Sequence, residues 1–180
     1  MVFLQNTTDK KQKMPEFVFS QVVKEIRLII NTEELFFNSL HEEMIASVYN
    51  SQNRSIKQIV GHLIDSASNN LHRIVHLQYN ECPLIFPNYA TNGNNDKWID
   101  IQNYQEEDWH ALVQLWKYSN LHIIHVIKHI NTNTVNNKWI ASLGKEISLK
   151  DMVMDYPGHL KLHIGEIHEL YNKYIADTEV

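Results

Sequence analysis

Apolar residues recur every three to four positions through four long stretches of the chain, which is the period of an amphipathic helix. These stretches predict helices over about 17–48, 56–79, 105–130 and 148–174. Ser55 and Ser148 stand at the starts of the second and fourth stretches, where N-cap residues are expected. Pro15 suits the first turn of the first helix. We therefore expect a flexible tail over 1–14 and one all-α domain over 15–180.

Two connections between these helices stand out. The segment 81–104 contains Pro83, Pro87, Gly93 and many asparagines, and shows no clear period. We interpret it as a long crossover loop, because helices that are not antiparallel neighbours need such a connection. The segment 131–147 predicts a small hairpin. Four amphipathic helices joined in this way indicate a four-helix bundle.

The composition limits the class of protein. The 180 residues carry a net charge of −5, which argues against a nucleic-acid binder that depends on a basic surface. No apolar run approaches the roughly 18 residues that a membrane span needs, and the N-terminus is too polar for a signal peptide. The single cysteine, Cys82, fits a reducing compartment, and no base stands at a spacing that would make it a nucleophile. We expect a soluble, cytoplasmic protein.

Histidine is the unusual feature of the composition, with eleven residues. Two histidines four residues apart on a helix project from one face and can share a metal ion. At this histidine content chance alone supplies about one such pair, so the spacing by itself is weak evidence. The chain contains three pairs: His72/His76, His125/His129 and His159/His163.

Helical phase separates the pairs. At about 100° per residue, His163 lies about 40° and His159 about 80° from the apolar direction of the fourth helix. The other two pairs lie about 150° or more from the apolar directions of their helices and should face solvent. An unpaired buried imidazole costs ~1–3 kcal/mol, so the inward pair either shares a metal or bonds to the backbone or to Asp155 and Glu166.

His62, on the second helix, lies about 130° from the apolar centre of that helix. Ser66 and Arg73 continue the same polar stripe. This stripe either lines a cleft or forms a solvated edge, and phase alone favours the edge.

Three segments, in this order, resemble the DinB-like superfamily, also called YfiT-like. They are SIKQIVGHLIDSASNNLHR (55–73), NYQEEDWHALVQLWKYSN (103–120) and DYPGHLKLHIGEI (155–167). The resemblance extends over nearly the whole chain from about residue 20. It implies an up-down-down-up four-helix bundle, whose long crossover joins the second and third helices.

The resemblance also implies a metal site built from one histidine of the second helix and an HxxxH pair of the fourth. These positions fall on His62, His159 and His163, and the expected cofactor is one divalent transition metal, zinc or nickel. The chain departs from the pattern at two places. Leu162 stands where many relatives carry another histidine, and Pro157 lies inside the predicted fourth helix, where proline removes a hydrogen bond.

Two further polar residues are candidates for substrate binding. Arg73 could bind an anionic group through a bidentate contact, or could pair with Glu33 of the first helix. Asn120 lies close to the apolar direction of the third helix and could contact a substrate or bridge helices. Trp109 and Trp116 are interpreted as core residues.

The resemblance implies a metal-dependent enzyme acting on a small molecule, as a transferase of a low-molecular-weight thiol or as a hydrolase. No catalytic residue can be assigned, and Asp65, Asp155 and Glu166 are the candidates for a general base. The alternative is a non-catalytic, metal-binding or stress-related bundle that acts as a dimeric scaffold. We expect a homodimer without nucleic-acid or membrane partners.

Overall fold

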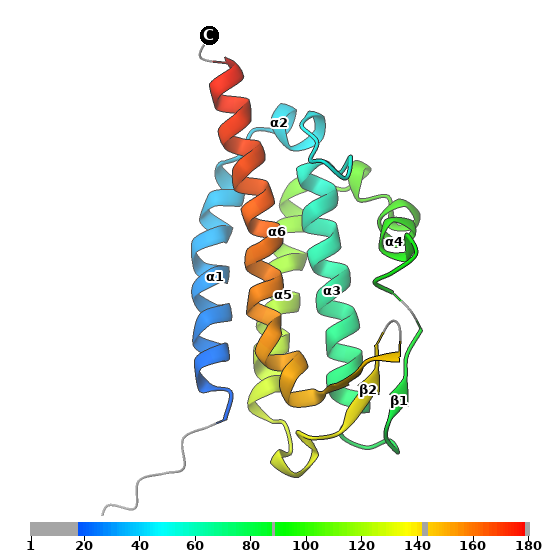
Figure 1. Ribbon diagram of the computed structural model, residues 1–180. Helices are drawn as coiled ribbons and strands as arrows, with labels where there is room; N and C mark the ends of the chain where they lie inside the picture. Colours follow the sequence, from blue (N-terminus) through cyan, green and yellow to red (C-terminus); the bar gives the residue numbers. More distant parts are fainter. Residues whose placement is uncertain (1–17, 88, 142–143, 179–180) are drawn as a thin grey trace, which may run out of the picture.

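The computed structural model describes residues 18–87, 89–141 and 144–178, and its main body is a bundle of four long helices (Figure 1). Both α1 and α3 pack against α5 and α6, so α1 and α3 occupy opposite corners of the bundle. In Figure 1, α1 and α6 run upward while α3 and α5 run downward, which confirms the up-down-down-up topology. The four helices are α1 (Ser20–Ser39), α3 (Ile56–His76), α5 (Trp109–Lys128) and α6 (Leu149–Thr178).

Local hydrogen bonds define where three of these helices begin. Ser55 caps α3 with a capping box, in which it exchanges hydrogen bonds with Gln58. The Asp108 carboxylate accepts the Ala111 N–H at 2.8 Å and so begins α5 four residues later than predicted. The hydroxyl of Ser148 accepts the N–H of Asp151 at 3.0 Å at the start of α6.

Large apolar side chains fill the centre of the bundle. Trp116 is fully buried and meets Phe37 edge-on at a centroid distance of 5.0 Å. Trp109 packs against the same core and donates its indole N–H to the Phe37 carbonyl at 3.0 Å. Both tryptophans are therefore core residues, as predicted.

The first helix is shorter than predicted, because the single helix expected over 17–48 is interrupted. Leu40 and His41 have extended backbones, after which α2 (Glu42–Ser47) begins. The apolar period continues across this break because Met44 and Ile45 of α2 are also buried. The pattern of hydrophobic residues thus could not reveal the change of direction. Residue 17 and the predicted tail over 1–14 lie outside the described residues.

The crossover between α3 and α5 was predicted as a structureless loop, and this was wrong. It contains β1 (Leu84–Ile85), α4 (Asn94–Gln102) and the 3₁₀ turn η1 (Tyr104–Glu106). The strand β1 pairs in parallel with β2 (Lys138–Ile140), which pairs antiparallel with β3 (Glu146–Ser148). The hairpin expected after α5 is therefore present as β2 and β3. The strand β1 of the crossover adds a third strand to it. A two-residue strand whose partner lies more than fifty residues away leaves no local signal.

The crossover also covers a face of α3 that would otherwise be solvated, since both α4 and η1 pack against α3. The ring of Tyr104 lies directly on the backbone at Gly61, where an added Cβ would be 2.1 Å from the ring. Asp65 and Ser66, polar residues of the same helix, are buried as a result.

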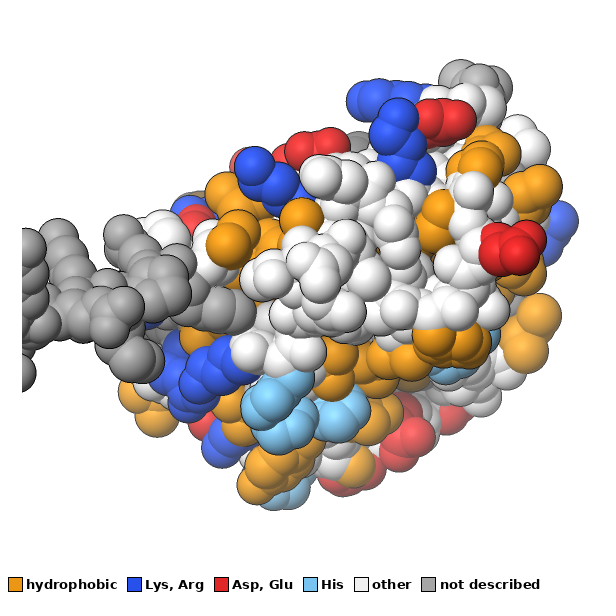
Figure 2. Space-filling view, turned by 90° about the horizontal axis from the view of Figure 1, so that it is seen from below, with side chains coloured by type: hydrophobic (Ala, Val, Ile, Leu, Met, Phe, Trp, Pro, Cys, Tyr) orange, Lys and Arg blue, Asp and Glu red, His pale blue; other side chains and the backbone are white. Residues whose placement is uncertain are grey.

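No helix in the described part of the chain is long and apolar enough to cross a bilayer. The lower end of the bundle, where α3 and α5 end, carries hydrophobic, basic, acidic and neutral side chains together with several histidines (Figure 2). His72, His125 and His129 are exposed and His76 is half-buried, in agreement with the outward direction predicted for these two pairs.

Candidate metal centre

Three histidines from two antiparallel neighbouring helices come together inside the bundle. His62 comes from α3, and His159 and His163 come from successive turns of α6. Each offers a ring nitrogen, and these three atoms all lie within 4.8 Å of one another. His62 and His163 are 4% and 8% exposed, and His159 is half-buried. The helix α6 continues through Pro157, two residues before His159.

The burial of His62 was not expected from its helical phase, which placed it at a flank. The crossover explains the difference, because Tyr89 from this segment packs against the imidazole and hydrogen bonds to it. A residue at the edge of the apolar stripe of α3 thereby becomes part of the interior. The contact is non-local, so no pattern within α3 contains it.

Burial keeps two of the three rings in the neutral form that metals bind. It lowers the pKa of His62 to about 3, with further contributions from His163, His159 and Arg54. Burial, followed by the neighbouring His163, lowers the pKa of His159 to about 4. At neutral pH both rings therefore present a lone pair without first losing a proton.

Tyr89 orients the ring of His62. Its hydroxyl lies 2.9 Å from Nδ1 of His62 and 3.5 Å from the carbonyl oxygen of the same residue. When the hydroxyl donates to that carbonyl, its oxygen can accept the Nδ1–H of the imidazole. The lone pair of His62 is then on Nε2. Hydrogen bonds of this kind to the second ring nitrogen are what fix the tautomer of a metal-binding histidine.

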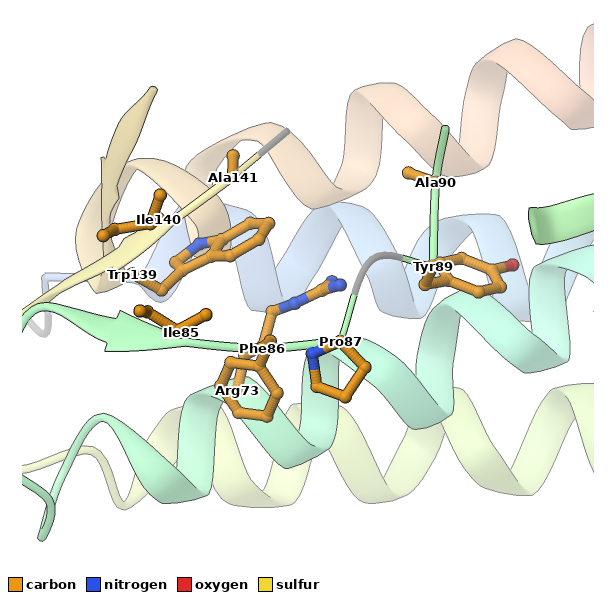
Figure 3. Close-up of a pocket in the computed structure, with 9 residues that line it drawn as sticks. All are labelled: Arg73, Ile85, Phe86, Pro87, Tyr89, Ala90, Trp139, Ile140 and Ala141. Carbon is orange, nitrogen blue, oxygen red and sulfur yellow. The ribbon is translucent and has the colours of Figure 1, made fainter. Parts of the chain in front are cut away.

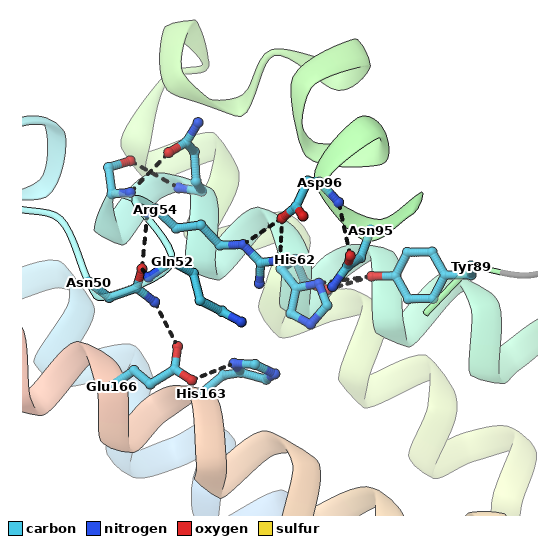
Figure 4. A network of polar contacts seen from close by, with 11 residues as sticks. Asn50, Gln52, Arg54, His62, Tyr89, Asn95, Asp96, His163 and Glu166 are labelled. Atoms are coloured by element: carbon cyan, nitrogen blue, oxygen red, sulfur yellow. Dashed lines mark hydrogen bonds and ion pairs between the residues drawn. The ribbon is translucent and has the colours of Figure 1, made fainter. Parts of the chain in front are cut away.

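A similar chain of contacts reaches His163 from the loop between α2 and α3 (Figure 4). Oε1 of Glu166 lies 3.3 Å from Nδ1 of His163, at ion-pair distance but outside hydrogen-bond geometry. The other carboxylate oxygen accepts a hydrogen bond from the amide of Asn50 at 3.1 Å. Glu166 is thus held beside Nδ1, where a small rotation would complete a carboxylate–histidine pair.

His159 supplies the clearest sign that the cluster fits a metal ion. Its Nε2 is buried and has no hydrogen-bond partner among the described residues. A buried polar atom without a partner costs ~1–3 kcal/mol, and a bound ion would remove this cost. Three histidine nitrogens within 4.8 Å of one another form a donor set that suits zinc, nickel and similar divalent ions.

An ion pair between a buried arginine and an exposed aspartate lies close to His62. Arg54 is 5% exposed, and its Nε donates to Oδ1 of Asp96 from α4 at 3.1 Å (Figure 4). The positive charge of Arg54 contributes to the lowered pKa of His62. Sequence reasoning missed Arg54, Asp96 and Tyr89, because each depends on where the crossover lies.

The histidine cluster borders a pocket of about 230 Å³ through one of its members. His159 lines this pocket, together with Tyr89 from the crossover and Tyr156 from α6. The polar stripe of α3 continues along its wall. The remaining lining residues are Ser66, Asn70, Arg73, Ala90, Trp139, Ile147, Met152 and Asp155. The stripe therefore lines a cleft, which was the alternative that helical phase had not favoured.

The three candidate general bases occupy different environments. Asp65 accepts hydrogen bonds from Tyr104 at 2.6 Å and from Gln102, and its burial raises its pKa. Glu166 lies beside His163, as described above. Asp155 is exposed and is the one of the three that lines the pocket.

The two residues that the sequence suggested for substrate binding, Asn120 and Arg73, have different surroundings in the structure. The amide of Asn120 is fully buried, donates to the Trp116 carbonyl at 2.8 Å and accepts from the Tyr156 hydroxyl at 2.7 Å. It therefore bridges α5 and α6. Arg73, by contrast, lines the same pocket as His159. Its alternative partner, Glu33, instead lies 2.9 Å from Nε2 of His168.

Comparison with solved structures identifies a protein of the same fold. YfiT from Bacillus subtilis superposes with a TM-score of 0.71, over 96% of this chain and 93% of that chain, at 17% sequence identity. It has been described as "a probable metal-dependent hydrolase with an unusual four-helix bundle topology". No protein-family model and no curated protein sequence matches the chain. The chain thus has a YfiT-like fold, which confirms at the level of fold the resemblance drawn from its sequence.

Proposed function

From a YfiT-like fold that carries a buried cluster of three histidines, we propose that this protein is a divalent-metal-dependent enzyme acting on a small molecule. The reaction is either a hydrolysis or the transfer of a low-molecular-weight thiol. His62, His159 and His163 would hold the ion, with zinc and nickel as the leading choices. The description of YfiT as "a probable metal-dependent hydrolase" supports this assignment.

The observation that carries the proposal is the open side of the cluster. Three protein ligands with space beside them are typical of catalytic metal sites, whereas structural sites are closed by a fourth protein ligand. Here His159 lies on the wall of a pocket that a small molecule can enter. When bound, a divalent ion would act as a Lewis acid that lowers the pKa of a water or thiol and makes it nucleophilic.

The protein's own groups would hold the site in its working form. Tyr89 would keep the proton of His62 on Nδ1, and Glu166 would do the same for His163 after a small rotation. Asp155, at the rim of the pocket, is the carboxylate best situated to accept a proton from a bound substrate. The apolar side chains of the lining, among them Met152 and Ile147, would limit the access of water.

Metal analysis tests the first half of the proposal. Purified protein is expected to contain one zinc or nickel ion per chain, and His163→Ala is expected to lose it while keeping its helical circular dichroism. The double variant His125→Ala/His129→Ala is a matched control, since it removes an exposed pair with the same spacing on α5. Equal metal content in His163→Ala and in the wild type would contradict the assignment.

Assays of turnover test the second half of the proposal, that the protein is an enzyme. The metal-loaded protein is assayed with a panel of esters and amides, and with electrophiles in the presence of low-molecular-weight thiols. Activity is expected in the wild type and in the His125→Ala/His129→Ala control, and a loss of at least about a hundredfold is expected in His163→Ala. Full activity in His163→Ala would overturn the enzymatic proposal. A bound metal without turnover of any substrate would favour the non-catalytic scaffold.

A further inference from the structure

Arg73 lies at the end of the pocket that is further from the histidine cluster. It belongs to α3, and the residue is 7% exposed. The guanidinium carbon lies 4.3 Å from the centre of the Trp139 ring and 5.8 Å from that of Phe86. Two aromatic rings from β2 and from the crossover thus hold one positive charge inside the protein.

This charge has no counter-ion in the described part of the chain. No carboxylate there lies within 4.0 Å of the Arg73 guanidinium, and Glu33 is engaged with His168. Nε of Arg73 is buried and has no hydrogen-bond partner among the residues that the structure describes. Burial lowers the pKa of Arg73, yet a guanidinium remains charged at any physiological pH. A buried charge is normally paired, so the unpaired donor points to an anion that the protein does not itself supply.

The guanidinium faces space that connects it to the histidine cluster. Arg73, Tyr89, Ala90 and Trp139 line both the pocket that contains His159 and a neighbouring pocket of about 180 Å³. In Figure 3 the Arg73 side chain passes Trp139, and its guanidinium end points along the pocket toward Tyr89. Tyr89 in turn hydrogen bonds to His62.

We infer that Arg73 binds a carboxylate of the substrate, and that the substrate is an organic acid whose reacting group lies at its other end. The fork of N–H donors matches the two oxygens of a carboxylate. The position of the reacting group rests on the proposed function, whereas carboxylate binding at Arg73 does not.

The spacing along α3 sets the shape of such a substrate. Arg73 follows His62 by eleven residues, which returns to nearly the same side of the helix and advances about 16 Å along its axis. The long Arg73 side chain, which points back toward Tyr89, covers part of this distance. An extended small acid can therefore reach both ends of the pocket. Asp155 also lines the pocket and would repel a carboxylate, so the anion is expected at the Arg73 end.

Binding of a simple carboxylate tests this inference without any assay of activity. Sodium propionate is titrated into the protein while tryptophan fluorescence and the Nε–H proton resonance of Arg73 are followed. Propionamide, which has nearly the same shape and no charge, is the ligand control. Propionate is expected to saturate both signals at millimolar concentration, and propionamide to leave them unchanged. Trp139→Phe should remove most of the fluorescence change, since Trp139 stacks on Arg73.

Four variants assign the binding site. Arg73→Met should weaken propionate binding at least tenfold, and Arg73→Lys, which keeps the charge without the fork, should bind with intermediate affinity. Arg27→Met makes the same change at an exposed arginine of α1 and should bind as the wild type does. Binding should also persist in His163→Ala, even if that variant shows that the metal proposal is wrong. Equal propionate affinity in Arg73→Met and wild type, with both folded, would overturn the inference, as would binding lost in His163→Ala alone.

Discussion

The hydroxyl of Tyr89 lies 2.9 Å from Nδ1 of His62, so a residue of the crossover orients a histidine of α3. The two residues are separated by 27 positions in the sequence. Hydrogen bonds of this kind to metal-binding histidines are commonly responsible for a tenfold to hundredfold change in metal affinity.

Tyr89→Phe should weaken the affinity for zinc by about tenfold or more, because the His62 ring loses the partner that fixes its tautomer. Competition against a chromophoric chelator measures the affinity. Tyr118→Phe, at an exposed tyrosine of α5, is the control and should bind zinc as the wild type does. An unchanged affinity in Tyr89→Phe would mean that the hydroxyl has no part in metal binding.

Glu166→Gln should also weaken zinc binding, by about tenfold, because a neutral amide supports the Nδ1–H of His163 less well than a carboxylate. The contact from Asn50 can survive, since the amide of glutamine retains an acceptor oxygen. The same competition assay applies, with Glu169→Gln on the exposed side of α6 as the control. If the two variants bind zinc equally well, Glu166 does not position His163.

Gly61→Ala should destabilise the protein by about 1–3 kcal/mol, because the new Cβ would lie 2.1 Å from the Tyr104 ring. The gain in helix propensity, at most about 1 kcal/mol, is too small to offset this clash. Gly165→Ala on α6 is the matched control, because nothing lies within 4 Å of its added Cβ. It should be neutral or slightly stabilising. Urea unfolding measures the free energy of unfolding of both variants. A Gly61→Ala protein as stable as the wild type would contradict the close packing of Tyr104.

Asp65 should make stability depend on pH. Burial raises its pKa above the ordinary value of 3.8, although hydrogen bonds from Tyr104 and Gln102 oppose the shift. A raised carboxyl pKa means that the folded state holds the proton more tightly than the unfolded chain does. The stabilisation is therefore complete below about pH 3.8 and is lost as the pH rises through the raised pKa.

Asp65→Asn removes this titration and keeps an oxygen that accepts from Tyr104. The variant should be at least as stable as the wild type at pH 7.5, and the difference between the two should shrink as the pH falls toward 4. Urea unfolding at several pH values measures this difference in stability. Asp100→Asn, on the exposed side of α4, is the control. A variant clearly less stable than the wild type at pH 7.5 would show that the ionised carboxylate is favourable.

Much of the architecture could be predicted from the sequence, because it depends on local features. Helical periodicity identified the four long helices, and Ser55 and Ser148 marked two of their starts. Helical phase distinguished the inward pair, His159 and His163, from the two outward pairs. In each case the signal and the structure it predicts lie within a few turns of one helix.

The tertiary structure decided what depends on segments far apart in the sequence. The break at Leu40 was hidden because Met44 and Ile45 continue the apolar period after the chain has turned. His62 is buried, and Arg73 faces a pocket, only because the crossover lies over α3 and brings Tyr89 and Phe86 against it. Periodicity reports which side of a helix is apolar, but it does not report which distant segment covers the polar side. The physical reason is that burial is a property of the packed chain, whereas helical phase is a property of a single helix.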